Sequence, residues 1–469
     1  MAMMKGFSNA FRIPELRKKI LITLGLVFVC RLVSQIPTPG VDWAALSKAI
    51  ADMRAASNSS GGLMDIFDVF TGGALGQCAI GFLSIWPYIS AQIVIQLLSS
   101  VIPSLEKLKK EGESGRQQLA QITRYLTIFL CIVQSWGIAT VVSTPGLGIG
   151  LSYEGHLLQA VGNPGLGFHL MTMIGMTSAS LFVMWLADQI TTFGIGNGAS
   201  LIIMINITSR LPAALISAWE RYFGLAGVQA SAPIAELPIV IGFFILVVMG
   251  TVMLVQGVRK VVIHSTRRSV GGGSTYGMQQ TFMPLRVNYT GVMPIIFAQP
   301  LIQIPAALLA KATDATAPGF SGMVHRFAQD LANPTALHMV VYALLIMFFA
   351  FFWVATQFNA IDISENLKKG GSYIPGIRPG RATAEYLDDM MTKITLIGGT
   401  GLLVVALIPM LLMGWMHIPW AIASFFGGTS LLIIVGVALD TLRIMESHLL
   451  VRKYEGFLAH GSLRGRGGM

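Results

Sequence analysis

Charged residues are scarce in this chain. Asp, Glu, Lys and Arg make up 12% of its 469 residues, whereas they make up about a quarter of an ordinary soluble domain. Hydrophobic residues account for 54% of the chain, and its mean hydropathy is +0.67. Apolar runs of membrane-spanning length recur throughout, in place of the short alternating segments of a membrane barrel. The composition therefore excludes a soluble protein and predicts a polytopic helical membrane protein.

The chain also lacks the motifs that usually carry catalysis or metal binding. Its three cysteines, Cys30, Cys78 and Cys131, form no C-x-x-C pair and no metal-ligand spacing. P-loop and H-E-x-x-H motifs are absent, and "GIGNG" (Gly194 to Gly198) follows a membrane helix and not a strand. The S-x-x-K match that begins at Ser104 has none of its companion motifs. We therefore expect no enzymatic activity, no cofactor and no metal site.

Ten apolar runs fit membrane spans. The first follows a basic stretch but has no small-residue cleavage site before "PTPG", so it is interpreted as a retained span and not as a signal peptide. Five spans in each half make the two halves enter the membrane from opposite faces, so any internal symmetry is an inverted repeat. The spans are predicted at residues 20–37, 74–100, 120–142, 168–190, 199–219, 237–258, 289–310, 338–357, 393–413 and 420–440.

Basic residues gather on one side of this topology. Most of the 32 Lys and Arg residues lie in the two termini and in the four loops of the same side. By the positive-inside rule, both termini are expected in the cytoplasm. The long basic loops after spans 2, 6 and 8 suit an acidic or polyanionic partner, such as ribosomal RNA or an acidic protein surface. The same charges also fit a role that only fixes topology.

Titratable groups are sparse inside the spans. No chain of Asp, Glu and His runs through them, although proton- or ion-coupled carriers commonly use one. Arg31 lies within the first span and has no assigned role. In the second span, Ile85 and Ile89 lie one turn apart, and a lipid-facing pair is the default interpretation. Composition and topology alone leave a channel and an inverted-repeat secondary transporter of a small solute both open.

An amphipathic half-helix precedes the second span, in "GGLMDIFDVFTGGALG" (Gly61 to Gly76). At ~1.5 Å per residue the helix is about 13 Å long, roughly half of a hydrocarbon core. Asp65 and Asp68 lie opposite its apolar stripe. The periodicity alone fits an interfacial surface helix as well as a mobile element. The stripe has i, i+3, i+4 and i+7 spacing and consists of Leu63, Ile66, Phe67 and Phe70.

A turn in the loop after span 8 isolates one arginine. Pro375, Gly376, Pro379 and Gly380 bracket Arg378, so a rigid turn is expected to present a single guanidinium group. An ordinary turn with a topology charge is the alternative interpretation.

Several long motifs are distributed along nearly the whole chain. They are "MDIFDVFTGGAL", "WPYISAQIVIQLL", "KKEGESGR", "ITTFGIGNG", "MPLRVNYTGVMPIIFA", "NLKKGGSYIPGIRPG", "YLDDMMTKITL" and "FFGGTSLLIIVGVALD". With these motifs the chain resembles the SecY family, the protein-conducting channel of the bacterial secretory pathway, in the family's order and spacing from about Arg12 to Glu455. The resemblance implies an all-α polytopic membrane protein, with ten transmembrane helices in two inverted five-helix halves around a central pore.

The resemblance assigns roles along that pore. Residues 61–73 correspond to a plug, whose apolar face holds Leu63, Met64, Ile66, Phe67 and Phe70. The pore ring maps onto Ile85, Ile89, Ala199, Ile203, Ile296 and Ile433. Ala199 replaces a position that is often a bulkier aliphatic residue, which predicts a wider or looser constriction there. A lateral gate lies between spans 2–3 and 7–8, and its polar lining is assigned to Ser90, Gln134 and Asn288.

The same resemblance implies partners on the cytoplasmic side. The loops after spans 6 and 8 correspond to docking sites for the ribosome, through ribosomal RNA and proteins, and for the SecA motor ATPase. The candidate docking residues are Arg267, Arg268, Arg286, Lys368, Lys369 and Arg378. Near "GGGST" the loop tip carries fewer basic residues than family members usually do, which predicts weaker or differently tuned docking. Small membrane subunits of the SecE and SecG type, signal peptides, preproteins and the lipid bilayer complete the implied partners.

The expected domain organisation follows from these assignments. Residues 1–19 form a cytoplasmic N-terminal segment, 20–219 the first five-helix half with the plug, and 220–442 the second half. The docking loops are 259–288 and 358–392, and residues 443–469 form a cytoplasmic C-terminal tail. The expected function is to pass unfolded secretory polypeptides across the bacterial inner membrane and to release transmembrane segments laterally into lipid. Translation or a bound ATPase must drive it, because no nucleotide site is visible in the sequence.

Overall fold

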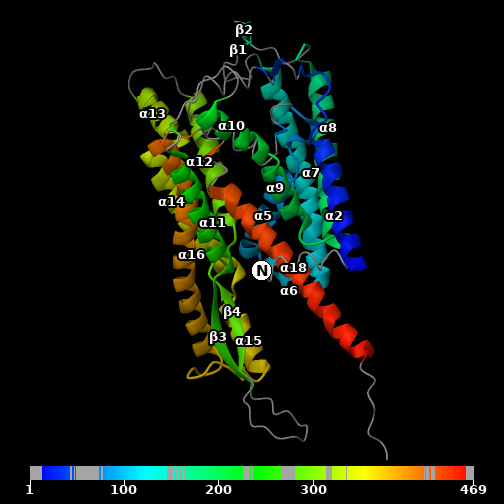
Figure 1. Cartoon of the computed structure of the whole chain (residues 1–469), viewed down its shortest axis with the longest axis vertical. Helices are drawn as coiled ribbons and strands as arrows, with labels where there is room; N and C mark the ends of the chain where they lie inside the picture. The colour runs from blue at the N-terminus through cyan, green and yellow to red at the C-terminus, as the bar shows by residue number, and fades with distance from the viewer. Residues whose placement is uncertain are drawn as a thin grey trace, which may run out of the picture. The chain divides into compact units, whose positions relative to one another are not determined.

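The computed structural model has an all-α, membrane-spanning architecture (Figure 1). It describes residues 13–42, 45–46, 48, 73–74, 78–144, 152–153, 156–157, 161–162, 165–224, 233, 236–265, 280–312, 320–333, 335–416, 418, 422–423 and 428–460. The elements are α2 (Pro14–Val33), the 3-10 turn η1 (Ile80–Phe82), α5 (Trp86–Val101), α6 (Pro103–Lys110), α7 (Glu113–Ser143), β1 (Ser152–Tyr153), β2 (His156–Leu157), α8 (Leu166–Phe193), α9 (Gly198–Thr208), α10 (Leu211–Phe223), α11 (Glu236–Gln256), β3 (Val258–Ser265), β4 (Gln280–Arg286), α12 (Met293–Ala312), α13 (Phe320–Ala332), α14 (Ala336–Gln357), α15 (Ala360–Lys369), β5 (Ser372–Tyr373), α16 (Arg381–Met416) and α18 (Gly428–His460).

Each of the ten predicted spans overlaps a described helical segment. Within the described part of the chain, seven segments are long and apolar enough to cross a membrane. They begin with η1 and α5, and continue with α7, α8, α9 plus α10, α11, α14 plus α15, and α16. The remaining predicted spans correspond to α2, α12 and α18. In α2, Arg17, Lys18 and Lys19 at the start and Arg31 at the end raise the charge of a helix that is otherwise apolar.

Large apolar side chains cover the outward faces of these helices. On α11, for example, Ile245, Leu246 and Met253 are each more than half exposed. Such a surface is unfavourable in water but is satisfied by hydrocarbon. These helices are therefore built to face lipid on one side and packed protein on the other.

Two of the long spans are each divided into two helices. Asn359 caps α15 because its side-chain oxygen accepts hydrogen bonds from the amides of Ile361 and Asp362, at 3.1 and 3.3 Å. This cap starts a new helix directly after α14, with only Phe358 and Asn359 between them. In span 5, residues 209–210 form a turn that separates α9 from α10.

The chain divides into two compact units, which are described separately. The first unit holds α2 to α9 and the part of α18 from Val437 onward; the second runs from Pro212 to Gly436. In the first unit, α7 and α2 both pack along α8 (Figure 1). One of its cores gathers residues from loops and helices that are far apart in sequence: Val41, Leu46, Cys78, Leu83, Ala139, Val142, Val161, Phe168 and Met176.

The second unit has its main core where α12, α14 and α16 meet. Tyr342 of α14 is buried there, and its hydroxyl donates a 3.2 Å hydrogen bond to the side-chain oxygen of Gln299 on α12. At one end of this unit, β3, β4, β5 and α15 form a small body beside the start of α16 (Figure 1). The amphipathic helix α13 lies at the opposite end.

Candidate functional site

Span 2 is interrupted where two candidate ring residues occur. After η1, Ser84 adopts a left-handed conformation with φ +46°, which is unusual for a residue with a side chain. Helix α5 then begins at Trp86, with Ile85 as its N-cap residue. Ile85 and Ile89 are both buried, and the amide of Ile89 donates a 3.1 Å hydrogen bond to the carbonyl of Ile85. Both side chains therefore belong to the first turns of a helix that starts at a sharp break.

The break is tied to the end of α2. The amide of Ile80 donates a 2.8 Å hydrogen bond to the carbonyl of Ile36, and the amide of Thr38 donates one of 3.0 Å to the carbonyl of Cys78. A Cβ atom added to Gly81 would lie 2.9 Å from the carbonyl oxygen of Val33. Only glycine therefore permits this close approach.

The glycine-rich turn "GIGNG" holds the helix that carries the next two ring candidates. Asn197 caps α9, because its side-chain oxygen accepts a 3.1 Å hydrogen bond from the amide of Ser200. The amide of Ile195 donates a 3.1 Å hydrogen bond to the hydroxyl of Thr23 on α2. Ala199 and Ile203, one turn apart on α9, are both half-buried. The motif therefore serves helix docking rather than phosphate binding.

Two ring candidates belong to the second unit. Ile296 on α12 and Ile433 on α18 are both buried. Their chain neighbours Ile295 and Leu432 belong to the main core of that unit. Because successive helical residues are rotated by about 100°, Ile296 and Ile433 face a different direction from those core residues.

Two of the candidate gate residues, Ser90 and Gln134, are polar groups within the apolar helices α5 and α7, and Asn288 lies between β4 and α12. The Ser90 hydroxyl donates a 3.0 Å hydrogen bond to the carbonyl of Trp86. Buried Asn288 accepts a 3.3 Å hydrogen bond from the hydroxyl of Thr290. Within the described residues, the side-chain oxygen of Gln134 is buried and has no hydrogen-bond partner. Such a group is costly in an apolar interior, so Gln134 has unused capacity to bind a polar group.

The candidate plug residues Leu63, Met64, Ile66, Phe67 and Phe70 lie outside the described residues. Gly73, the last residue of the predicted plug, is described and has φ +100°. A Cβ atom there would lie 3.0 Å from the guanidinium carbon of Arg210. The arginine therefore packs directly against the glycine that follows the half-helix.

The two long loops after spans 6 and 8 form one folded body, which the sequence did not predict. β3 pairs antiparallel with β4, and its other edge pairs with β5 from the loop after span 8. Val261, Leu285 and Ile374 from the three strand segments share a buried core with Leu387 of α16. The missed signal was the run of β-branched residues Val261, Val262 and Ile263, which is typical of a strand.

This body presents most of the described docking candidates to solvent. Arg286, Lys368, Lys369 and Arg378 are exposed, whereas Arg267 and Arg268 lie outside the described residues. The turn around Arg378 has glycines in the left-handed region and a side-chain hydrogen bond to its backbone. Gly376 and Gly380 have φ +81° and +106°, and the hydroxyl of Thr383 donates a 2.9 Å hydrogen bond to the carbonyl of Arg378.

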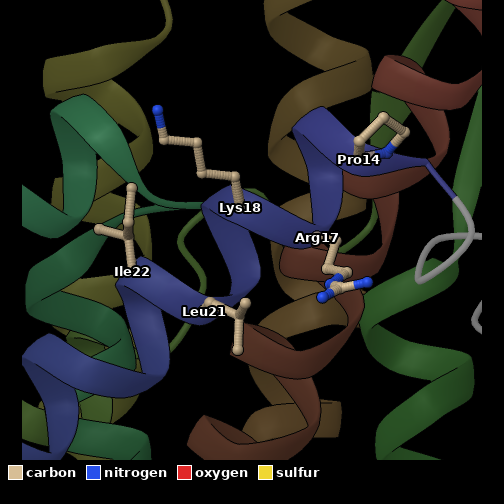
Figure 2. A pocket seen from close by; sticks show the side chains of 5 residues that line it. All are labelled: Pro14, Arg17, Lys18, Leu21 and Ile22. Atoms are coloured by element: carbon tan, nitrogen blue, oxygen red, sulfur yellow. The ribbon is translucent and has the colours of Figure 1, made fainter.

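A shallow groove of about 610 Å³ follows the start of α2. It is lined by Pro14, Arg17, Lys18, Leu21 and Ile22. Figure 2 shows the side chains of Arg17 and Lys18 pointing in different directions from the helix. Within the described residues, no group of three or more His, Cys, Asp and Glu side chains could hold a metal ion.

Comparison with known proteins identifies the family. The SecY family model matches residues 79–442. The protein translocase subunit SecY of Streptomyces scabiei is 41% identical over 457 residues, which cover 97% of this chain and 100% of the relative. The chain belongs to the SecY family.

Solved structures of SecY-type channels have the same fold. A structure of a protein-conducting channel matches with a TM-score of 0.59 and 15% identity, and covers 94% of each chain. Canine Sec61 in a ribosome–channel complex matches with a TM-score of 0.57 and 17% identity, also over 94% of each chain. Membership of the SecY family decides between the two functions that composition left open. The chain is a channel subunit of a protein translocase and not a small-solute transporter.

Proposed function

We propose that the chain is the central subunit of a Sec translocon, which passes unfolded secretory polypeptides across the bacterial inner membrane. The proposal is carried by family membership over nearly the whole chain, at 41% identity to a translocase subunit. Its ten predicted spans and basic loops agree with a multi-pass protein whose termini both lie in the cytoplasm.

The proposed constriction consists of Ile85, Ile89, Ala199, Ile203, Ile296 and Ile433. Aliphatic side chains carry no charge and offer no hydrogen bond, so they do not hold a passing polypeptide. A narrow apolar ring also resists wetting, which limits ion leakage at rest. At position 199 the small Ala side chain fills less of the ring than Ile does, and local leakage is expected to be highest there. The half-helix at 61–73 is proposed to seal this constriction as a plug.

Lateral release is the second proposed activity. A transmembrane segment gains its stability only in hydrocarbon, because its backbone hydrogen bonds are already satisfied within the helix. We propose that such segments leave past Ser90, Gln134 and Asn288. When the gate helices separate, these polar groups can exchange hydrogen bonds to protein for hydrogen bonds to water. This lowers the free energy needed to open an otherwise apolar interface. Signal peptides are proposed to bind at the same polar lining.

The driving force is proposed to come from partners on the cytoplasmic body. Arg286, Lys368, Lys369 and Arg378 are exposed cations on one folded surface, suited to ribosomal RNA or to acidic protein groups. The ribosome and the SecA ATPase are the proposed partners, and canine Sec61, which shares the fold, is part of a ribosome–channel complex. SecE-type and SecG-type subunits are proposed to cover lipid-facing helices.

Site-specific crosslinking tests this function. A photoreactive residue at position 89 is expected to crosslink a stalled secretory nascent chain in membrane vesicles. The matched control is position 94 on the same helix, where Val94 is 39% exposed and faces away from the buried side that holds Ile89. An adduct at 89 that exceeds the one at 94 supports the channel. Equal adducts, or none at either position while the ribosome is bound, would refute it.

A further inference from the structure

A polar bridge crosses the first unit inside its apolar interior. The guanidinium of Arg31 donates a 3.4 Å hydrogen bond from Nη1 to the side-chain oxygen of Asn206. The amide nitrogen of Asn206 donates a 3.1 Å hydrogen bond to the hydroxyl of Ser84. Asn206 is 1% exposed and Ser84 is 2% exposed. We call these three residues the Arg31–Asn206–Ser84 bridge.

The bridge joins three elements that are far apart in sequence. Arg31 lies in the last turn of α2, Asn206 lies near the end of α9, and Ser84 forms the break before α5. The main-chain hydrogen bonds between residues 36–38 and 78–80 link only the first and third of these elements. The Asn206 side chain therefore ties α9 directly to both of the other elements, in addition to the hydrogen bond from Ile195 to Thr23 at the start of α9.

Two of the three bridge residues, Ser84 and Asn206, lie close in sequence to candidate ring residues. Ile85 follows Ser84 directly, and Ile89 lies one turn further along α5. On α9, Ile203 precedes Asn206 by three residues, which places the two on neighbouring parts of one helix face. A change in the Asn206–Ser84 distance must therefore move Ile85 relative to Ile203.

The conformation of Ser84 makes this tie informative. Its φ of +46° costs free energy for a residue with a side chain. The hydroxyl that accepts from Asn206 belongs to the same residue, so the hydrogen bond is made at the break between η1 and α5. Arg31 is half-buried, and withdrawing part of its charge from water costs free energy, so stability alone accounts poorly for its position. Holding a fixed geometry is the function that best accounts for the arrangement.

We propose that the Arg31–Asn206–Ser84 bridge positions Ile85, Ile89 and Ile203 and thereby sets the resting width of the constriction. The inference rests on the proposed role of these isoleucines as a pore ring. Arg31 and Asn206 act through Ser84 and touch no substrate, so they are positioning residues. The bridge assigns a role to Arg31, for which the sequence offered none.

Asn206→Leu and Asn206→Asp form the central test. Leucine has a similar volume but makes neither hydrogen bond, whereas an aspartate accepts from the Arg31 guanidinium and from the Ser84 hydroxyl. Resting ion conductance is measured in planar bilayers with the assembled translocase. Asn206→Leu is expected to raise the resting ion conductance about tenfold, the factor by which loss of one buried hydrogen bond shifts a two-state equilibrium. Asn206→Asp is expected to keep the conductance of the unaltered protein.

Two further variants guard against a purely structural effect. Ser84→Gly suits the left-handed backbone and removes the side chain together with the hydroxyl that accepts from Asn206, so it should leak as Asn206→Leu does. Thr177→Val removes another interhelical hydrogen bond of the first unit, the 3.1 Å contact between the Thr177 and Ser135 hydroxyls, and should leave the leak unchanged. Thermal unfolding is followed in parallel with a thiol-reactive dye, because Cys30, Cys78 and Cys131 are free and buried.

The outcomes separate this inference from the proposed function. Leak in Asn206→Leu and Ser84→Gly, with rescue by Asn206→Asp, supports the bridge. If Ile89→Ser leaks while both bridge variants stay tight, the bridge proposal is overturned and the ring stands. If neither Ile89→Ser nor deletion of residues 63–71 leaks, the proposed ring and plug fail, and the bridge inference fails with them. A leak of the same size in Thr177→Val would mean that loss of an unrelated interhelical hydrogen bond in this unit also raises the conductance, and it would overturn the bridge proposal as well.

Discussion

His264 on β3 and Tyr373 on β5 are paired residues of one sheet, and their rings pack edge to face with centroids 5.8 Å apart. The contact joins the loop after span 6 to the loop after span 8. The two regions that were expected to dock partners separately are therefore one surface. A partner that binds one loop therefore binds a body that contains both, because the two loops share a sheet and a buried core.

Tyr373→Ala should loosen this joint. Loss of an aromatic pair is expected to cost the body about 1 kcal/mol, and the amides of β3 should then exchange with solvent faster. Hydrogen exchange measured by mass spectrometry on the purified protein checks this. Tyr386→Ala is the matched control, because Tyr386 lies on the same body and is 37% exposed. Equal exchange of β3 in both variants would contradict the role of the His264–Tyr373 contact.

Arg378→Glu should impair transport driven by the ATPase without unfolding the body. The turn is held by its glycines and by the Thr383 hydroxyl on the Arg378 carbonyl, so the substitution changes charge and not backbone. Loss of a charge-assisted hydrogen bond to a partner is expected to reduce preprotein transport about tenfold in reconstituted vesicles. Arg381→Glu makes the same change of charge three residues away, where the arginine pairs with Glu385 at 3.0 Å. If both variants transport equally well, Arg378 has no specific docking role.

The spans and the Arg378 turn were predictable from the sequence because each depends on local pattern. Apolar runs of sufficient length indicate helices wherever they occur, and Pro375, Gly376, Pro379 and Gly380 restrict the backbone directly. The β3–β4 ribbon was predictable in part, because Val261, Val262 and Ile263 form a β-branched run that is typical of a strand. That run was not used in predicting the loop, and the pairing with β5 depends on a contact more than a hundred residues away in sequence.

The Arg31–Asn206–Ser84 bridge could not be predicted from local pattern. Arg31 and Asn206 are separated by 175 residues, and Asn206 and Ser84 by 122. A single Asn in an apolar helix indicates only that it needs a polar partner. Which partner it finds depends on how α2, α9 and the break before α5 pack together. Roles in the pore ring, plug and gate came from the family resemblance and stay predictions.

Ile89→Ser should raise the resting ion conductance. A hydroxyl in a narrow apolar constriction favours wetting, and water carries ions through. Deletion of residues 63–71 should have the same effect by removing the proposed plug. Val94→Ser on the exposed side of α5 is the matched control, and it should conduct as the unaltered protein does. Planar-bilayer recordings check all three. Unchanged conductance in both the ring variant and the deletion would rule out a plug and ring in this chain.

Gly398→Ala should destabilise the second unit at the segment that carries Asn288. A Cβ atom on Gly398 of α16 would overlap the carbonyl oxygen of Val287. Neither atom can turn aside, because the backbone fixes the position of a Cβ atom and the carbonyl oxygen is itself a main-chain atom. Relieving the overlap requires α16 to move away from residues 287–288, at an expected cost of about 1–3 kcal/mol. Gly414→Ala in the same helix is the control, since no atom lies within 4 Å of its added Cβ and alanine favours helix. The fraction of monodisperse protein that survives heating in detergent should fall for Gly398→Ala and should hold or rise for Gly414→Ala. Equal survival of the two variants would mean that α16 has room to shift at Gly398, and that the backbone contact does not fix the position of Asn288.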